Sequence, residues 1–137
     1  MKTYLDSSAF AKRFVDEKGS DTVEDVCAQA SELALSVFCV PEIISALNRR
    51  LREGALTKDQ YAEARRCLID DVRDANIINL TVPVIGSAIT VLESSPIRAM
   101  DALHIACALE WRAQLFVSSD KKQLSAAKRA GLTTRKV

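Results

Sequence analysis

The chain has 137 residues, of which 48% are hydrophobic and 27% charged, the length and composition of one globular domain with a real core. Only four Gly and three Pro argue against a sandwich of many short strands and favour a helix-rich fold. The net charge of +1 is uninformative as a total, although the basic residues gather in short clusters suited to phosphates. For any one cluster, a solvated helix face is the simpler interpretation.

The cysteines are widely separated and form no C-x-x-C pair, which argues against a zinc ribbon and a thioredoxin-like site. Buried free thiols in a reducing compartment fit best. The N-terminal sequence MKTYLDSS enters a predicted strand almost at once, which leaves no room for a secretory signal. No apolar run approaches the length of a membrane span, so we expect a soluble, cytoplasmic domain without a membrane partner. The four cysteines are Cys27, Cys39, Cys67 and Cys107.

The first half of the chain alternates short β-prone runs with helical patterns. The first run stops at Asp6-Ser7-Ser8. A later helix has Pro41 in its first turn, where proline is favoured, and ends at Gly54. The predicted elements are a strand at 3–5, a helix at 9–15, a helix capped by Ser20 or Asp21 that runs to about 30, a strand at 33–37 and a helix from 41 to 53.

The second half continues this alternation. Thr57 opens a helical pattern with Gln60 three residues later, the spacing of a capping box. The predicted elements are helices at 57–72, 83–92, 102–111 and 121–130, strands at 77–80 and 115–117, and an edge strand at 133–137. Strands that alternate with helices predict βαβ units, hence a mostly parallel sheet of four to five strands flanked by helices. With no repeat or linker, we expect one domain over residues 1–137.

Four acidic residues share one kind of placement in this pattern. Asp6 and Asp120 directly follow predicted strands, and Glu42 and Asp101 lie in the first turns of predicted helices. In a parallel sheet the carboxyl ends of the strands and the helix starts that follow them lie on one rim, where open α/β sheets bind ligands. We therefore expect the four carboxylates to form one cluster. Taken singly, each is explained at least as well by a helix N-cap or a partner of the helix dipole.

Repulsion limits what such a cluster can be. At an effective dielectric near 20 and separations of about 6 Å, each like-charged pair costs roughly 3 kcal/mol. The pairs among four carboxylates together cost roughly 15 kcal/mol, comparable to the whole stability of a domain. Protonation or bound cations must relieve this, and oxygen-only ligands with room for water favour Mg²⁺ or Mn²⁺ over zinc. Such an ion activates a water nucleophile and neutralises charge on a phosphodiester, which is nuclease chemistry.

Four segments, in chain order, resemble the successive signature segments of the PIN domain family: YLDSSAFAKRF, VPEIISALNRR, DALHIACALEW and VSSDKKQLSAAKRAGL. More narrowly, the chain is similar to the VapC toxins of bacterial and archaeal toxin–antitoxin pairs. The resemblance spans almost the whole chain and implies a three-layer αβα fold and an endoribonuclease that depends on Mg²⁺ or Mn²⁺. It also implies a homodimer and a neutralising, VapB-like antitoxin whose C-terminal segment fills the active-site groove.

The resemblance also assigns catalytic roles to the four acids. Asp6, Glu42 and Asp101 match the core metal-site acids of the family, and are expected to hold the ion directly or through water. Asp120 matches the fourth acid, which more often acts through water and is expected to orient the attacking water or a second ion. None of the four acidic positions departs from the family pattern, so nothing suggests a catalytically dead copy.

Two hydroxyl residues and two basic pairs complete the predicted site. Ser8 and Ser119 fall where the family places small hydroxyl residues that support the acids by hydrogen bonding, although serine at a helix start is commonly just a cap. The basic residues that are expected to grip the RNA backbone, by analogy with phosphate-positioning contacts, are Arg49, Arg50, Lys121 and Lys122.

Other classes of function fit parts of the pattern. A signalling receiver domain also collects acids at strand ends around Mg²⁺, but Asp6-Ser7-Ser8 lacks the paired acids that it needs after the first strand. A non-catalytic or regulatory PIN-like protein-binding module, whose acids pair with arginines of a partner, remains the alternative to a nuclease. His104 is the only histidine, which argues against a Ser-His-Asp triad and a multi-histidine zinc site. Inside so apolar a helix we expect it as a hydrogen-bonded core residue.

Overall fold

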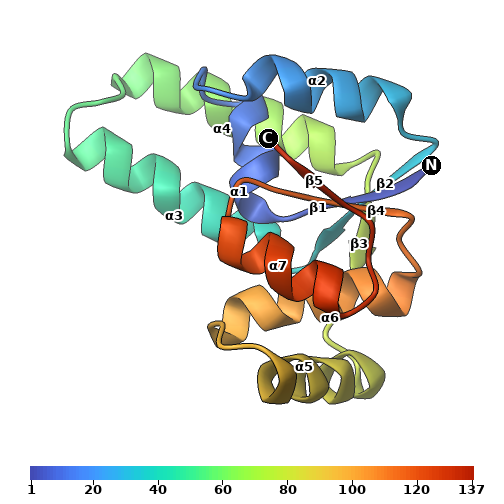
Figure 1. Cartoon of the computed structure of the whole chain (residues 1–137). Coiled ribbons are helices and arrows are strands. Elements are labelled where there is room, and N and C mark those ends of the chain that lie inside the picture. Colours follow the sequence, from blue (N-terminus) through green and yellow to red (C-terminus); the bar gives the residue numbers. More distant parts are fainter.

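The computed structural model describes all residues from 1 to 137 (Figure 1). Five strands form one central sheet in the order β3-β2-β1-β4-β5, so that β1 lies in the middle between β2 and β4. Every neighbouring pair is parallel, which confirms the predicted parallel sheet. The strands are β1 (Lys2–Leu5), β2 (Glu32–Ser36), β3 (Asn76–Ile78), β4 (Leu115–Ser118) and β5 (Thr134–Lys136).

Helices cover both faces of the sheet, which confirms the predicted three-layer αβα architecture (Figure 1). The buried side chains divide into two clusters, one shared by the sheet with α1 to α4 and the other shared by the sheet with α5 to α7. The helices are α1 (Ser7–Phe10), α2 (Ser20–Gln29), α3 (Cys39–Arg52), α4 (Lys58–Val72), α5 (Val82–Ser94), α6 (Ala99–Trp111) and α7 (Lys121–Arg129).

The two central strands send alternate side chains into the two clusters. Tyr4 of β1 and Phe116 of β4 belong to the cluster beneath α5 to α7, and their rings stack with centroids 5.6 Å apart. Leu5 and Val117 point to the other cluster, beneath α1 to α4. All four side chains are fully buried, and burial of each contributes about 1.5–3 kcal/mol. Because both faces are covered, these strands read as continuous apolar runs in the sequence.

β1 and β4 end at the same rim of the sheet. The pairing extends past the last residue of β1, because the backbone N–H of Asp6 donates to the carbonyl of Val117 over 3.1 Å. The chain then turns into α1 after β1 and into α7 after β4. Residues 6–8 and 118–120 therefore lie side by side, as shown by the hydrogen bond from Ser119 N–H to Ser8 Oγ, 3.2 Å long.

The helix predicted at 9–15 differs in the structure. α1 begins two residues earlier, at Ser7, because the side chain of Asp6 caps it by accepting a hydrogen bond from Ala9 N–H. It is also shorter than predicted, since the chain passes into a tighter 3₁₀ turn at Ala11–Arg13. The capping therefore places the carboxylate of Asp6 at the start of the helix, facing the end of β4.

The side-chain cap predicted for α2 was wrong. Neither Ser20 nor Asp21 caps the helix; its N-cap is Gly19, with φ of 96° in the left-handed region. A Cβ at Gly19 would lie 2.7 Å from the carbonyl carbon of Val137, so only glycine fits this close approach. Ser20 is instead the first helical residue, and its hydroxyl accepts a hydrogen bond from Glu17 N–H.

The capping box predicted at Thr57 is confirmed. Its hydroxyl accepts from Gln60 N–H over 3.1 Å, and the Gln60 side chain accepts from Thr57 N–H over 2.9 Å. The helix predicted at 102–111 begins earlier, at Ala99, so Asp101 is its third residue and not its opening residue. The strand predicted at 77–80 is short, ends at Ile78 and lies at the edge of the sheet.

α5 is apolar on two sides. Its buried face, with Val84, Ala88 and Val91, packs into the core. Its outer face leaves an apolar stripe in solvent, made up of Val82, Ile85, Ile89 and Leu92. No helix of the chain combines the length and apolarity needed to cross a membrane.

Candidate active site

Asp6 lies at the centre of the rim and is almost entirely buried, with 2% of its surface exposed. Its Oδ1 accepts hydrogen bonds from Ser8 Oγ over 2.7 Å and from Ala9 N–H over 2.9 Å. Its Oδ2 accepts from Ser118 Oγ over 2.6 Å. Burial raises the pKa of Asp6 because it penalises the charged form, and the hydrogen bonds offset this only in part. The pocket thus holds the carboxylate in one orientation while disfavouring its negative charge.

Glu42 lies in the first turn of α3 and is tied to two neighbours through one oxygen. Its Oε1 accepts from Ser7 Oγ over 2.6 Å and contacts His104 Nε2 at 2.8 Å. Burial alone would raise the pKa of Glu42, but the hydrogen bonds from His104 and Ser7 outweigh it and lower the pKa. Glu42 therefore keeps its negative charge more readily than Asp6 does.

His104 fixes the position of Glu42 from beneath. The ring is 3% exposed, and its Nδ1 lies 2.8 Å from the hydroxyl of Tyr4. Burial raises the pKa of Tyr4 well above its usual value, so the phenol keeps its proton and shares a hydrogen bond with Nδ1. The Glu42 carboxylate can only accept, so Nε2 donates to it. As expected, His104 is a hydrogen-bonded core residue, but one of its two bonds leads directly into the site.

Asp101 and Asp120 face the rim from α6 and α7. Asp101 is partly buried, and its nearest cation is Arg98, whose Nε lies 3.9 Å from Oδ2. Burial raises the pKa of Asp101, and the negative charge of Asp120 raises it further. Asp120 is the N-cap of α7 and accepts from the backbone N–H groups of Lys122 and Gln123. Asp6 also raises the pKa of Asp101, so the three carboxylates interact.

Ser118 and Gln123 join these acids into one network. The hydroxyl of Ser118, which donates to Asp6, also accepts from Asp120 N–H over 3.0 Å. Gln123 is 2% exposed, and its amide donates to the backbone carbonyl of Asp101 over 3.2 Å. The other end of the Gln123 amide, Oε1, lies 3.3 Å from Ser118 Oγ. The positions of the three aspartates are therefore coupled through two buried polar side chains.

The network gathers the acids at the rim without grouping them into a finished ion site. No three His, Cys, Asp or Glu side chains are already grouped as ligands of one ion. The hydrogen bonds to Glu42 fall on Oε1, which leaves Oε2 available, and the carboxylate of Asp101 meets only the distant Arg98. The raised pKa values of Asp6 and Asp101 show that this rim gains from added positive charge. An oxygen-only donor set of this kind fits a hard divalent cation.

The predicted supporting serines act differently from each other. Ser8 donates to Asp6, as expected for a residue that supports the site. Ser119 reaches the network only through its backbone N–H, which donates to Ser8. The side chain that supports Asp6 from the end of β4 is that of Ser118, one residue earlier.

The four predicted basic residues differ in how free they are. Arg50 is engaged in an ion pair with Glu17, with Nη2 and Oε2 3.1 Å apart. Arg49 is exposed on α3 and has no carboxylate within ion-pair distance. The same is true of Lys121 and Lys122 at the start of α7. Of the arginine pair, Arg49 is thus the one available to a phosphate.

Several residues of the network were not predicted from the sequence. None of these residues is charged: Ser7 and Gln123 fill ordinary helix positions and Ser118 is the last residue of β4, so their pattern gives little signal. One signal was present in β4, where a serine follows a buried apolar run and is itself fully buried. A buried hydroxyl needs a partner, and the adjacent rim offers Asp6.

The sequence matches the family model described as PIN domain over residues 3–129. It is 30% identical to Ribonuclease VapC45 from Mycobacterium tuberculosis (strain CDC 1551 / Oshkosh) over 106 residues, which cover 77% of this chain and 74% of that protein. The fold is similar to that of VapC20 from Mycobacterium tuberculosis, a toxin that cleaves the sarcin–ricin loop. This structure has a TM-score of 0.72 at 16% identity, with 98% and 99% of the two chains covered.

A second similar structure is VapBC2 from Rickettsia felis, bound to a DNA fragment from its promoter. It has a TM-score of 0.70 at 14% identity and covers 100% of this chain and 99% of that one. At these identities the similarity to both solved structures shows the fold alone.

Asp6→Asn is expected to raise the melting temperature by a few degrees at pH 7 in buffer without divalent ions, because it removes a buried charge. Folding raises the pKa of the Asp6 carboxyl, so its protonated form stabilises the folded state at pH values below the pKa of the unfolded chain. This stabilisation is lost as the pH rises through the pKa of the folded protein. The melting temperature of the wild-type protein should therefore approach that of the variant as the pH falls.

Thermal denaturation from pH 4 to pH 7 measures this difference, with the exposed Asp25→Asn as a matched control that should change little. An Asp6→Asn protein that melts below the wild type at pH 7 would show that the three hydrogen bonds to Asp6 outweigh its burial.

Proposed function

Given that this chain belongs to the PIN domain family, we propose that it is an endoribonuclease that depends on a divalent ion. The observation that carries this proposal is the coupling of Asp6, Asp101 and Asp120 at one rim of the sheet, with Glu42 tied to the same rim through Ser7 and His104. A rim of four acids whose one arginine, Arg98, lies 3.9 Å from Asp101 suits neither a structural core nor a neutral ligand, but it suits a cation.

Asp6, Glu42 and Asp101 would hold the ion, which we propose to be Mg²⁺ or Mn²⁺, directly or through water. When bound, such an ion supplies a water nucleophile of lowered pKa and neutralises negative charge on the phosphodiester. Asp120 would act at the edge of the site, since its Oδ1 is already used in capping α7. Its second oxygen is then the one that can orient water.

The remaining residues of the site position these acids. Ser8 holds one oxygen of the Asp6 carboxylate and Ser118 holds the other. His104, itself held by Tyr4, grips one oxygen of Glu42 and leaves the other free to bind. Such outer contacts orient ligands, and removing one costs about 10–100-fold in metal affinity or activity in comparable sites.

The substrate and partner proposals rest on the relatives. VapC45 is named a ribonuclease and VapC20 a toxin that cleaves the sarcin–ricin loop, so we propose RNA as the substrate and a toxin role for this chain. VapBC-5 from Mycobacterium tuberculosis, a solved structure of similar fold (TM-score 0.61, 18% identity), is a member of the VapBC family of toxin–antitoxin systems, and we propose a VapB-like antitoxin as the partner. Exposed cations beside the acids, above all Arg49, would bind the phosphates of the RNA or acidic groups of a partner.

The decisive experiment is to incubate the purified protein with total RNA in Mg²⁺ or Mn²⁺ and to map the cut ends. Asp101→Asn is expected to lower the cleavage rate on the order of a hundred-fold or more, because it removes one of the least encumbered carboxylates of the rim. Asp25→Asn is the control and should cut at the wild-type rate. Equal cutting by Asp101→Asn would remove the catalytic assignment, and no cutting by any form would favour the non-catalytic binding module.

Divalent ions should stabilise the folded protein. Mn²⁺ at about a hundred times its Kd is expected to add about 2.7 kcal/mol to the free energy of unfolding, provided that it binds only the folded state. The shift in melting temperature should be lost in Asp6→Asn and kept in Asp25→Asn. If Asp6→Asn responded to Mn²⁺ as strongly as the wild type, Asp6 would not be a ligand.

We also propose that the protein forms a homodimer through the outer face of α5. The apolar stripe supports this, because Val82 and Ile89 expose 87% and 53% of their surfaces and contiguous exposed apolar patches mark interfaces. Ile89→Lys is expected to convert the dimer to a monomer in sedimentation velocity, since a buried, unpaired lysine opposes association. Thr90→Lys, which adds the same charge beside the stripe, should remain dimeric; a wild-type monomer at all concentrations would contradict the proposal.

A further inference from the structure

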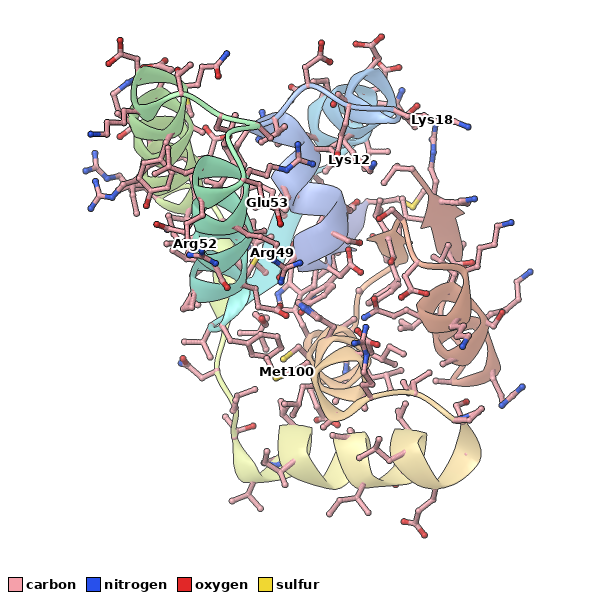
Figure 2. The ribbon with its side chains drawn as sticks, turned by 90° about the vertical axis from the view of Figure 1, so that its left-hand side faces the viewer. Lys12, Lys18, Arg49, Arg52, Glu53 and Met100 are labelled. Atoms are coloured by element: carbon pink, nitrogen blue, oxygen red, sulfur yellow. The ribbon has the colours of Figure 1, made fainter.

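A cavity of about 410 Å³ opens directly beside Glu42. Its wall includes Phe38 at the start of α3, Ser45 and Arg49 further along α3, and Met100 at the start of α6. Figure 2 views this face of the molecule, with Arg49 on α3 above Met100 beside α6. Apart from Glu42 and Arg49, none of these lining residues has a role in the site described so far.

We propose that this cavity binds one unpaired nucleobase of the RNA, next to the phosphodiester that the acids address, and that Arg49 binds the phosphate on the outer side of that nucleotide. The inference rests on the proposed ribonuclease function and adds to it a subsite for single-stranded RNA. A nucleotide has a flat apolar base and a negatively charged phosphate. The cavity has apolar side chains that can contact the base and an unpaired arginine that can bind the phosphate.

Phe38 supplies a rigid aromatic wall. Its ring centroid lies 4.6 Å from that of His104 at an interplanar angle of 63°, an edge contact that holds the ring in place. The same His104 positions Glu42, so the aromatic wall and the acid are set by one buried side chain. An aromatic side chain that is already fixed loses little entropy when a base stacks on it.

Met100 supplies the facing apolar surface. It leaves 41% of its surface exposed, although it directly precedes Asp101 at the polar rim. A thioether is polarisable and unbranched, and it makes favourable contacts with aromatic rings of different shapes. A methionine at this position fits a base without requiring one particular base.

Arg49 is aligned with the acid by the helix. It follows Glu42 by seven residues, two turns of α3, and Ser45 lies between them on the same face. Arg50 is paired with Glu17, whereas Arg49 has no carboxylate within ion-pair distance. A guanidinium that is free and exposed at the mouth of the cavity is suited to two oxygens of a phosphate.

The shape of the site selects single strands. A base inside a duplex is stacked and paired and cannot enter a side cavity, whereas a base in a loop can turn out and stack on protein. Glu42 would lie beside that base, so the phosphate between it and the next nucleotide faces the acids. The cut would therefore fall one phosphate away from a looped-out nucleotide.

The two methionines of the chain, Met1 and Met100, make the binding test direct. Protein labelled with ¹³C in the methionine methyl groups is titrated in EDTA with hexamers of adenylate or uridylate, and with an abasic hexamer of the same charge. The hexamers with bases are expected to shift the Met100 signal through the ring current and to leave Met1 in place. Equal shifts of Met100 by the abasic hexamer, or binding that leaves Met100 unmoved, would overturn the subsite.

Fluorescence anisotropy with labelled hexamers measures the affinities. Phe38→Leu and Met100→Ser are each expected to weaken binding of the adenylate hexamer roughly tenfold and to leave the abasic hexamer unaffected. Arg49→Gln should weaken both hexamers, and Arg52→Gln, an exposed arginine of the same helix that does not line the cavity, should weaken them less (Figure 2). If none of the three cavity variants differs from Arg52→Gln, the cavity does not bind RNA and a peptide of the partner is its remaining occupant.

The cleavage assay separates this inference from the proposed function. Wild-type protein that cuts RNA in Mn²⁺ while Phe38→Leu and Met100→Ser cut with unchanged kcat/KM would overturn the subsite and leave the nuclease. Protein that shifts Met100 with hexamers but cuts no RNA would overturn the nuclease and leave the subsite.

Discussion

The parallel pairing of β1 with β4 is the constraint on which the site depends. The register that stacks Tyr4 on Phe116 also brings Asp6 to Ser118, so that two residues 112 positions apart meet at 2.6 Å. A slip of one residue would send every side chain of the strand to the other cluster and turn Asp6 away from the rim. The buried aromatic pair and the buried carboxylate are thus two results of one register, and selection for the core also preserves the site.

The hydrogen bonds of the rim divide the acids into two kinds. Glu42, held by His104 and Ser7, has a lowered pKa and is a stable anion. Asp6 and Asp101 have raised pKa values, because burial opposes the charge of both and the neighbouring carboxylates of Asp120 and Asp6 oppose that of Asp101 as well. Glu42 can attract a cation from solvent because it is already charged. The charged forms of Asp6 and Asp101 are stabilised most once the cation is bound. Unfavourable burial at a functional site is a common exchange of stability for activity.

Periodicity and the ends of apolar runs predicted the parallel sheet flanked by helices, and the resemblance to the PIN domain family added the three-layer αβα arrangement. The same pattern predicted that the four acids lie at one rim, because each follows a strand or opens a helix. The contacts that orient the acids could not be predicted this way. The bond from His104 to Glu42 requires the relative placement of α3 and α6, and Ser118 acts because of the direction of one side chain. Gly19 caps α2 because Val137 approaches it closely, a tertiary contact that no local pattern contains. The cavity beside Phe38 could not be predicted from the sequence, because its walls come from two separate helices, α3 and α6.

The place of β4 beside β1 has a consequence for protein synthesis. Any N-terminal fragment that ends before residue 115 lacks β4. In such a fragment β1 has no neighbouring strand on one side, and Asp6 has no Ser118 to donate a hydrogen bond to it. The ribosome must release most of the chain before the first carboxylate can be fixed, because domains with such distant contacts assemble late. A nascent chain that has not yet emerged as far as residue 118 therefore lacks the hydrogen bond that fixes Asp6.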